Sequence, residues 1–382
     1  MSMEAGFDVA IAGGGIVGCA CALACARESF RVALVERDAL GSGATAAGMG
    51  HIVVMDDSEA QFALTYYSRE LWRELKLSAA AEYRETGTLW IAADSEEMDG
   101  AERKQAWYAE RGVSSRLLTA GELADAEPNL RKGLAGALLV AKDGVVYPPV
   151  AALELAARAE QLGARLIIGR EVKTIGEGRI VLNDGTELRA QRLIHALGAN
   201  ATALSPELPV RKRKGHLVIT DRYPGFVHHQ LVELGYLKSA HSSASDSVAF
   251  NVQPRPTGQI LIGSSRQYDA EDPGVDREIL GAMLARARLY MPALSRLNAI
   301  RVWTGFRAAT PDKLPLIGPA PGDKTIWLAT GHEGLGITTA LGTAELLVSA
   351  FTGRTPAIAP EPYLPERFAP AAKSASLTLE EQ

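Results

Sequence analysis

The stretch Gly13-Gly14-Gly15-Ile16-Val17-Gly18 decides the fold, because it fits the pattern G-x-G-x-x-G of dinucleotide-binding proteins. The apolar run Phe7–Ala12 before it predicts a buried strand, and the small residues of Ile16–Arg27 predict a closely packed helix. Another apolar run, Arg31–Glu36, completes a β-α-β unit and ends in the acidic residue that the pattern requires. We expect pyrophosphate binding at the helix N-terminus, with contacts from Gly13, Gly15, Ile16, Val17 and Gly18.

Two further blocks favour FAD as the dinucleotide. Glu36 can bond a ribose 2′-hydroxyl and repels a 2′-phosphate, which disfavours NADP. The small and hydroxyl residues of 40–50 can follow a long cofactor, and residues 329–338 form a second glycine-rich helix start that can stabilise negative charge on a flavin. The expected FAD contacts in these blocks are Glu36, Arg37, Gly43, Ala44, Thr45, Gly48, Met49, Gly331, Gly334, Leu335, Gly336, Ile337 and Thr338.

Composition limits the classes of function. The chain has 382 residues and a net charge of -5, which predicts two or three domains and argues against binding to nucleic acid or a membrane surface. The three cysteines, Cys19, Cys21 and Cys25, match no metal-binding spacing, so we interpret them as packing residues in a reducing, cytoplasmic compartment. We expect no metal site. Residues 9–26 lack a preceding positive region, so they do not read as a signal peptide.

The element pattern predicts a mixed α/β fold with a Rossmann-like FAD-binding domain and a discontinuous mixed-sheet substrate domain. Short strands at 165–168, 171–175, 179–182 and 187–190 predict an antiparallel meander, and 192–196 predicts a separate strand. We expect the FAD-binding domain at 1–85, 143–208 and 300–365, the substrate domain at 86–142 and 209–299, and a tail at 366–382.

Together the glycine-rich blocks resemble the D-amino acid oxidase-like family of FAD-dependent oxidoreductases. Three other motifs agree: Asp143–Pro148, Leu197-Gly198-Ala199, and Gly305-Phe306-Arg307 followed by 314–318. Tyr147 departs from the family's usual Asp, and Asn200 stands where the family has Trp. The resemblance runs from about residue 7 to about residue 350 and implies that Gly198 and Val172 also contact FAD.

Some details resemble a narrower group, the FAD subunits of multi-subunit dye-linked dehydrogenases. These details are Gly48-Met49-Gly50-His51, Lys214-Gly215-His216 and residues 331–338. The group includes the D-hydroxyproline dehydrogenase β subunit, the hydrogen cyanide synthase catalytic subunit and the β subunit of dye-linked L-proline dehydrogenase. The wider family includes glycine oxidase and the sarcosine oxidase β subunit. The resemblance implies hydride transfer from Cα of a small amino or imino acid to flavin N5, with D-hydroxyproline or D-proline preferred.

The resemblance also implies catalytic residues. Arg307 matches the family's clamp for the substrate carboxylate, which a guanidinium holds with two parallel bonds. His51 is expected beside the flavin ring, although a structural histidine is equally compatible with the sequence. Tyr236 can cover the pocket or pack in the core, and a side-chain role for Glu333 stays open.

The expected partners are other subunits, of an NAD/FAD type and a small iron–sulfur type, or a membrane electron acceptor at the inner face. FAD is expected to be non-covalent. The basic run Arg211–Lys214 can bind a phosphate, for example that of an FMN at a subunit interface. Such basic runs are, however, usually surface segments exposed to solvent. The main alternative is a free-standing glycine, sarcosine or D-amino acid oxidase that produces hydrogen peroxide. A flavin-binding tRNA-modification component lacks the needed basic surplus, and a nicotinamide enzyme leaves the second glycine block unused.

Overall fold

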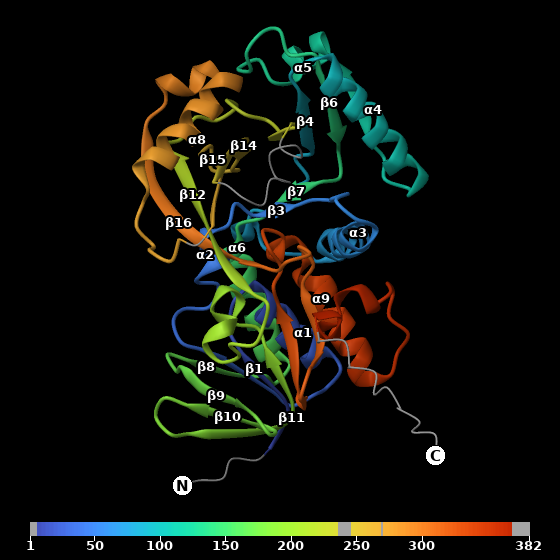
Figure 1. Ribbon diagram of the computed structural model, residues 1–382, viewed down its shortest axis with the longest axis vertical. Helices are drawn as coiled ribbons and strands as arrows, with labels where there is room; N and C mark the ends of the chain where they lie inside the picture. The colour runs from blue at the N-terminus through green and yellow to red at the C-terminus, as the bar shows by residue number, and fades with distance from the viewer. Residues whose placement is uncertain (1–5, 236–245, 269, 369–382) are drawn as a thin grey trace, which may run out of the picture.

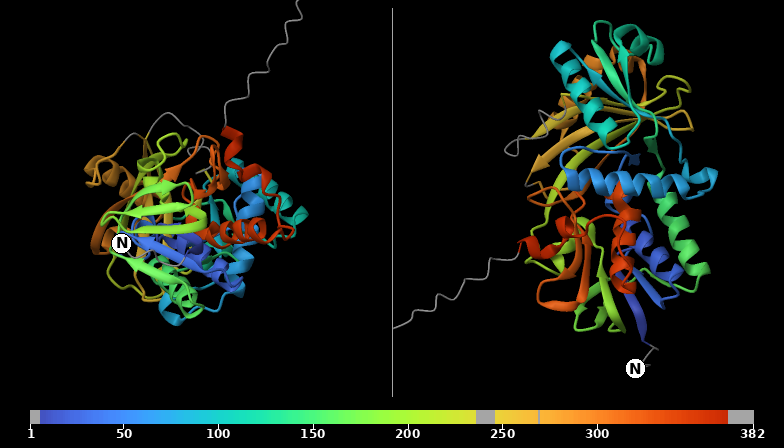
Figure 2. Two further views of the ribbon diagram at one scale, coloured as in Figure 1. Left: turned by 90° about the horizontal axis from the view of Figure 1, so that it is seen from below. Right: turned by 90° about the vertical axis from the view of Figure 1, so that its right-hand side faces the viewer.

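The computed structural model describes residues 6–235, 246–268 and 270–368, so the candidate Tyr236 lies outside the described residues. The molecule is elongated, with one large sheet towards each end (Figure 1). Helix α3 (Glu59–Glu74) crosses between the two sheets, as the side view in Figure 2 shows. This arrangement places the glycine-rich loops of one half against the sheet of the other.

The first sheet contains the predicted β-α-β unit. Its strands run in the order β17-β18-β11-β1-β2-β8, and β10 and β9 extend it from β11. Strand β1 pairs in parallel with both β2 and β11, and its residues Val9–Ala12 are fully buried, with a core on each face of the strand. The bounds are β1 (Phe7–Ala12), β2 (Val32–Glu36), β8 (Arg165–Ile168), β9 (Val172–Gly176), β10 (Arg179–Leu182), β11 (Glu187–His195), β17 (Leu316–Ala320) and β18 (Asp323–Thr330).

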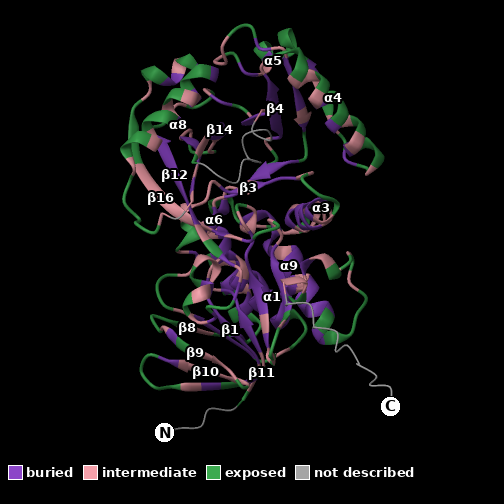
Figure 3. Cartoon of the chain, in the orientation of Figure 1, coloured by how far each residue is buried: buried purple, intermediate pink, exposed green. Residues whose placement is uncertain are grey.

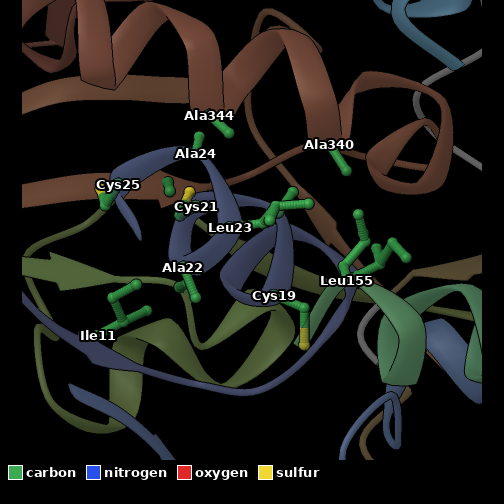
Figure 4. Packing of buried hydrophobic residues seen from close by; sticks show 14 of the residues in the cluster. Ile11, Cys19, Cys21, Ala22, Leu23, Ala24, Cys25, Leu155, Ala340 and Ala344 are labelled. Carbon is green, nitrogen blue, oxygen red and sulfur yellow. The ribbon is translucent and has the colours of Figure 1, made fainter. Parts of the chain in front are cut away.

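Three helices form a layer beside this sheet: α1 (Ile16–Arg27), α6 (Pro148–Gln161) and α9 (Gly336–Thr352). Small side chains allow α1 to lie close to its neighbours, and Figure 4 shows its three cysteines among Ala340, Ala344 and Leu155. All three thiols are buried and free, and burial raises the pKa of Cys19 and Cys25 to about 12. The interpretation of the cysteines as packing residues is confirmed.

The second sheet is mixed, with strand order β16-β12-β15-β14-β13-β4-β6-β5. The helices that cover this sheet each have an exposed face, as Figure 3 shows for α4 and α8. A core lies on each of its two faces. The bounds are β4 (Thr88–Ala92), β5 (Arg116–Thr119), β6 (Gly136–Val140), β12 (Arg211–Thr220), β13 (Gln230–Glu233), β14 (Ser247–Pro254), β15 (Ile260–Tyr268), β16 (Ala299–Ala309), α4 (Ser95–Glu110), α5 (Ala120–Ala126) and α8 (Arg277–Tyr290).

Short elements connect the halves: α2 (Ala44–Ala47) and the pair β3 (His51–Ile52) and β7 (Gly144–Val145). Helix α2 lies within the small-residue run of 40–50, and β3 follows that run directly, so this segment leads from the first sheet towards the second. No helix within the described ranges is long and apolar enough to span a membrane.

The structure corrects several expected elements. The strand at 165–168 is not part of a meander, because β8 pairs in parallel with β2. The strands expected at 187–190 and 192–196 form one continuous strand, β11. Its first residues pair antiparallel with β10, and its later residues pair in parallel with β1. Residues 300–309 were expected with the FAD-binding part, yet β16 pairs along β12 in the second sheet.

At the other expected boundary, Arg367 bonds Asp312 at 2.7 Å, so the first residues of the expected tail pack on the fold. Residues 369–382 lie outside the described part. The division into two domains otherwise stays a prediction.

Candidate cofactor and substrate site

The first glycine-rich turn is fixed by close backbone packing. Gly13 has φ of 109°, and a Cβ on it would lie 2.5 Å from Ala196 O. A Cβ on Gly18 would lie 1.8 Å from Gly13 O. Both positions therefore require glycine, and helix α1 begins with its N–H groups directed at the turn. Ile16 N donates to Thr45 Oγ1 at 3.0 Å, which joins this helix start to the small-residue run.

Glu36, at the end of β2, holds the turn from the other side. Its Oε2 accepts from Gly14 N at 2.6 Å, and its Oε1 accepts from Asp38 N at 2.8 Å. The residue also lines the cavity described next. A carboxylate at this place can both order the loop and accept a ribose hydroxyl.

A cavity of about 620 Å³ begins at this turn and extends to the second sheet. Its size falls within the range of ligand pockets. The expected cofactor contacts that line it are Gly13, Gly15, Ile16, Val17, Glu36, Arg37, Gly43, Ala44, Thr45, Gly48, Met49, Val172, Gly198, Gly334, Leu335, Gly336 and Ile337. Gly18, Gly331 and Thr338 do not line it. Gly18 packs under the turn, while Thr338 Oγ1 donates to His51 O at 2.7 Å and so supports the cavity wall.

The shape of the cavity fits an extended dinucleotide. Gly43 and Gly198 line it with φ of 62° and 54°, and a Cβ on either would meet nothing within 4 Å. The N-termini of both α1 and α9 open into it, through Ile16 and Leu335–Ile337. One helix start suits a pyrophosphate, and the other can stabilise charge on a ring at the far end.

The far end of the cavity carries paired charges. Arg307, on β16, lies over Gly215 and donates from Nη1 to Ser265 O at 3.0 Å. Arg213 and Glu333 form an ion pair in which both side chains are buried. The reading of residues 211–214 as a solvated face is therefore wrong for Arg213 and for Lys214, which are buried because β12 runs between two other strands.

Of the three histidines that line the cavity, His51 and His332 are neutral groups. Burial lowers the pKa of His51 to about 4, and among the described residues its Nε2 has no hydrogen-bond partner. Burial lowers the pKa of His332 to about 3, and its Nε2 lies 3.0 Å from Thr343 Oγ1. His51 therefore presents an uncharged ring to the cavity at neutral pH, whereas His332 is held within the wall.

Sequence reasoning missed the wall that the second sheet contributes. Trp90, Gln230 and Asn251 line the cavity from β4, β13 and β14. Their segments are far apart in the chain and carry no glycine-rich motif that would have indicated them. Within the described residues, no group of three or more His, Cys, Asp or Glu side chains is placed to hold a metal ion.

Comparisons with known proteins agree with this geometry. A family model described as FAD dependent oxidoreductase matches residues 8–350. Glycine oxidase of Pseudomonas aeruginosa is 28% identical over 94% of this chain and 98% of the relative. Hydrogen cyanide synthase subunit HcnC of the same species is 28% identical over 96% of this chain and 98% of the relative.

Solved structures of relatives have the same fold. L-proline dehydrogenase from P. horikoshii superposes with a TM-score of 0.85 at 26% identity, covering 95% of this chain and 98% of that one. Glycine oxidase from Geobacillus kaustophilus gives a TM-score of 0.82 at 27% identity, covering 94% and 98%. With the family model matching most of its length, the chain belongs to the D-amino acid oxidase-like (DAO) family of FAD-dependent oxidoreductases.

Proposed function

We propose that the protein is a dehydrogenase of small amino or imino acids, with D-hydroxyproline or D-proline as preferred substrate. Oxidation removes a hydride from Cα and a proton from the nitrogen, which leaves a C=N bond. FAD, when bound, accepts the hydride. The residues proposed to hold FAD are the expected contacts that line the cavity.

The observation that carries the proposal is the position of Arg307 at the far end of the cofactor cavity. Its guanidinium is steadied by Ser265 O at 3.0 Å and faces the same cavity as His51. A guanidinium has five N–H donors and stays charged, so it can hold Ser265 O and a substrate carboxylate together. This would orient Cα between the clamp and the ring end of the cofactor.

In this reaction no residue acts as a dedicated strong base during oxidation at Cα. His51 is neutral at pH 7, with burial lowering its pKa to about 4. A neutral imidazole can accept a hydrogen bond from the substrate nitrogen. Glu333 is proposed to act through Arg213, to which it is ion-paired, rather than on the substrate itself.

The test is anaerobic reduction of the FAD-loaded protein. Purified protein is mixed without oxygen with cis-4-hydroxy-D-proline, D-proline, L-proline, sarcosine or glycine, and loss of the visible absorbance of oxidised flavin is followed. We expect fast reduction by the D-prolines. Failure of every amino and imino acid to reduce the flavin would refute the proposal.

A free-standing oxidase is the second candidate, because glycine oxidase is among the relatives at 28% identity. The electron acceptor distinguishes the two. We expect slow reoxidation of the reduced protein by air, with electrons passing to partner subunits, in line with the relatives named as a synthase subunit and a proline dehydrogenase. Rapid release of hydrogen peroxide, with glycine or sarcosine as the best substrate, would favour the oxidase.

Partners and location follow from this proposal. The partner subunits would be of NAD/FAD and small iron–sulfur types, or the acceptor would lie in a membrane. A cytoplasmic location is proposed from three cysteines that are free and buried on one helix. Co-purification of the tagged protein from its own source, followed by identification of bound chains, tests the partners.

A further inference from the structure

The wall of the cavity formed by the second sheet presents polar groups that the proposed reaction does not use. Val232 pairs in register with Trp90 on one side and with Asn251 on the other, so these three side chains share a face. Gln230 is two residues before Val232 and lies on that face too. Trp90, Gln230, Val232 and Asn251 all line the cavity.

Three atoms on this wall are buried without a partner among the described residues. They are Trp90 Nε1, Gln230 Oε1 and Asn251 Oδ1. The three side chains are only 2%, 1% and 9% exposed. Buried polar atoms are nearly always hydrogen-bonded, so two acceptors and a donor gathered on one cavity wall indicate a ligand.

A hydrogen bond to Thr88 orients the Gln230 amide. Gln230 Nε2 donates to Thr88 Oγ1 at 3.0 Å. Gln230 Oε1 is buried and has no hydrogen-bond partner among the described residues. This end of the amide is therefore the one available to a ligand.

With its amide nitrogen on Thr88, Gln230 directs Oε1 away from Thr88 as an unpartnered acceptor. Trp90 is a diagonal neighbour of Gln230 across β4 and β13, close enough for an indole and an amide to reach one group between them.

We propose that this wall recognises a hydroxyl group on the substrate side chain, with Gln230 Oε1 accepting its proton and Trp90 Nε1 donating to its oxygen. Asn251 Oδ1 would lie between this hydroxyl and Arg307, the proposed clamp for the substrate carboxylate. The inference rests on the proposed function and narrows its substrate class to hydroxylated amino or imino acids. A hydroxyl both donates and accepts, which matches the atoms left unpartnered.

The geometry also sets a minimum substrate size. Arg307 is held at Ser265 on β15, and Gln230 stands on β13, two strands away. The pairing register also places Gln230 level with Leu261, four residues along β15 from Ser265, so the two backbone positions are about 16 Å apart. A substrate with only a carboxylate and an amine on one carbon would leave the wall unfilled, whereas a side chain carrying a hydroxyl reaches towards it.

The experiment compares matched substrate pairs in the FAD-loaded protein. The pairs are cis-4-hydroxy-D-proline and D-proline, D-serine and D-alanine, and their L counterparts, and the readout is the ratio of kcat/KM within each pair. We expect the hydroxylated member to be preferred by about 10- to 100-fold in at least one pair. In Gln230→Met this preference should largely disappear.

Three further variants separate recognition from damage to the fold. Thr88→Val removes the hydrogen bond that holds the Gln230 amide and lets the amide turn, so it should also lower the ratio, while Thr88→Ser should keep it. Gln267→Met is the matched control, since Gln267 is a 6% exposed glutamine of β15 that does not line the cavity. It should leave the ratio unchanged.

The outcomes are distinct. Equal use of both members by the wild type, or a preference that survives Gln230→Met, would overturn the inference and leave the proposed function standing. Loss of the ratio in Gln267→Met as well would also overturn it, because the effect would then not come from the cavity wall. If no amino acid reduces the flavin, the proposed function fails and the inference fails with it.

Discussion

Replacing Gly215 by alanine should impair catalysis while sparing the fold. A Cβ on Gly215 would lie 2.5 Å from Arg307 Nη1 and 3.0 Å from Arg307 Cζ. An ordinary contact needs about 3.5 Å, so the guanidinium must move by about 1 Å. Because it is the far end of a flexible side chain, the move costs little stability. Misplacement of a binding group by about 1 Å can lower the rate by about 100-fold.

The assay is anaerobic stopped-flow reduction of the flavin over a range of substrate concentrations. We expect a lower limiting rate and weaker substrate binding in Gly215→Ala, with FAD content and Tm near those of the wild type. Gly281→Ala is the control, since Gly281 is an exposed residue of α8 and a Cβ there meets nothing within 4 Å. Wild-type kinetics in Gly215→Ala would refute the clamp role of Arg307.

Three other predictions concern the first half of the fold. Gly13→Ala should lower the free energy of unfolding by about 2–4 kcal/mol even without FAD, from backbone strain and overlap; an unchanged urea midpoint of the apoprotein would contradict this. Burial lowers the pKa of His195 from 6.5 to about 4. The unfolded chain therefore binds more protons below pH 6.5, and stability should fall as the pH drops from 6.5 to about 4, by up to about 1.4 kcal/mol per pH unit from this residue. The fall should be shallower in His195→Leu when urea unfolding is compared at several pH values, and equal slopes would count against the assignment. The thiols of Cys19, Cys21 and Cys25 should react with Ellman's reagent only after denaturation, and rapid reaction of the native protein would show that α1 is not packed as described.

The cofactor half of the fold could be predicted because its signals are local. The bounds of β1 and α1 agree with the sequence expectation, since the strand ends at a glycine that packs against a backbone oxygen and the helix begins after it. The sequence also predicts a helix over Arg277–Tyr290, and α8 has those bounds, because Asp276 is a capping residue whose side chain accepts from two backbone N–H groups of the first turn. In each case a few adjacent residues determine the geometry.

Strand pairing was harder to predict because it depends on distant partners. The run 165–168 reads as the start of a meander, yet its neighbour is β2, more than a hundred residues earlier in the chain. The four-residue strand β13 was missed, because it is short and lies between β14 and β4, with which it pairs in opposite senses. Nothing within 230–233 specifies those neighbours.

The same reasoning explains why motifs locate the cofactor but not the substrate. The basic run 211–214 has the composition of a surface segment, but β12 is an inner strand and its Arg213 is buried against Glu333. The polar wall likewise exists only when β4, β13 and β14 are adjacent. Related chains can therefore keep every glycine of the FAD site and still differ in substrate, because substitutions at Trp90, Gln230 or Asn251 leave those motifs intact.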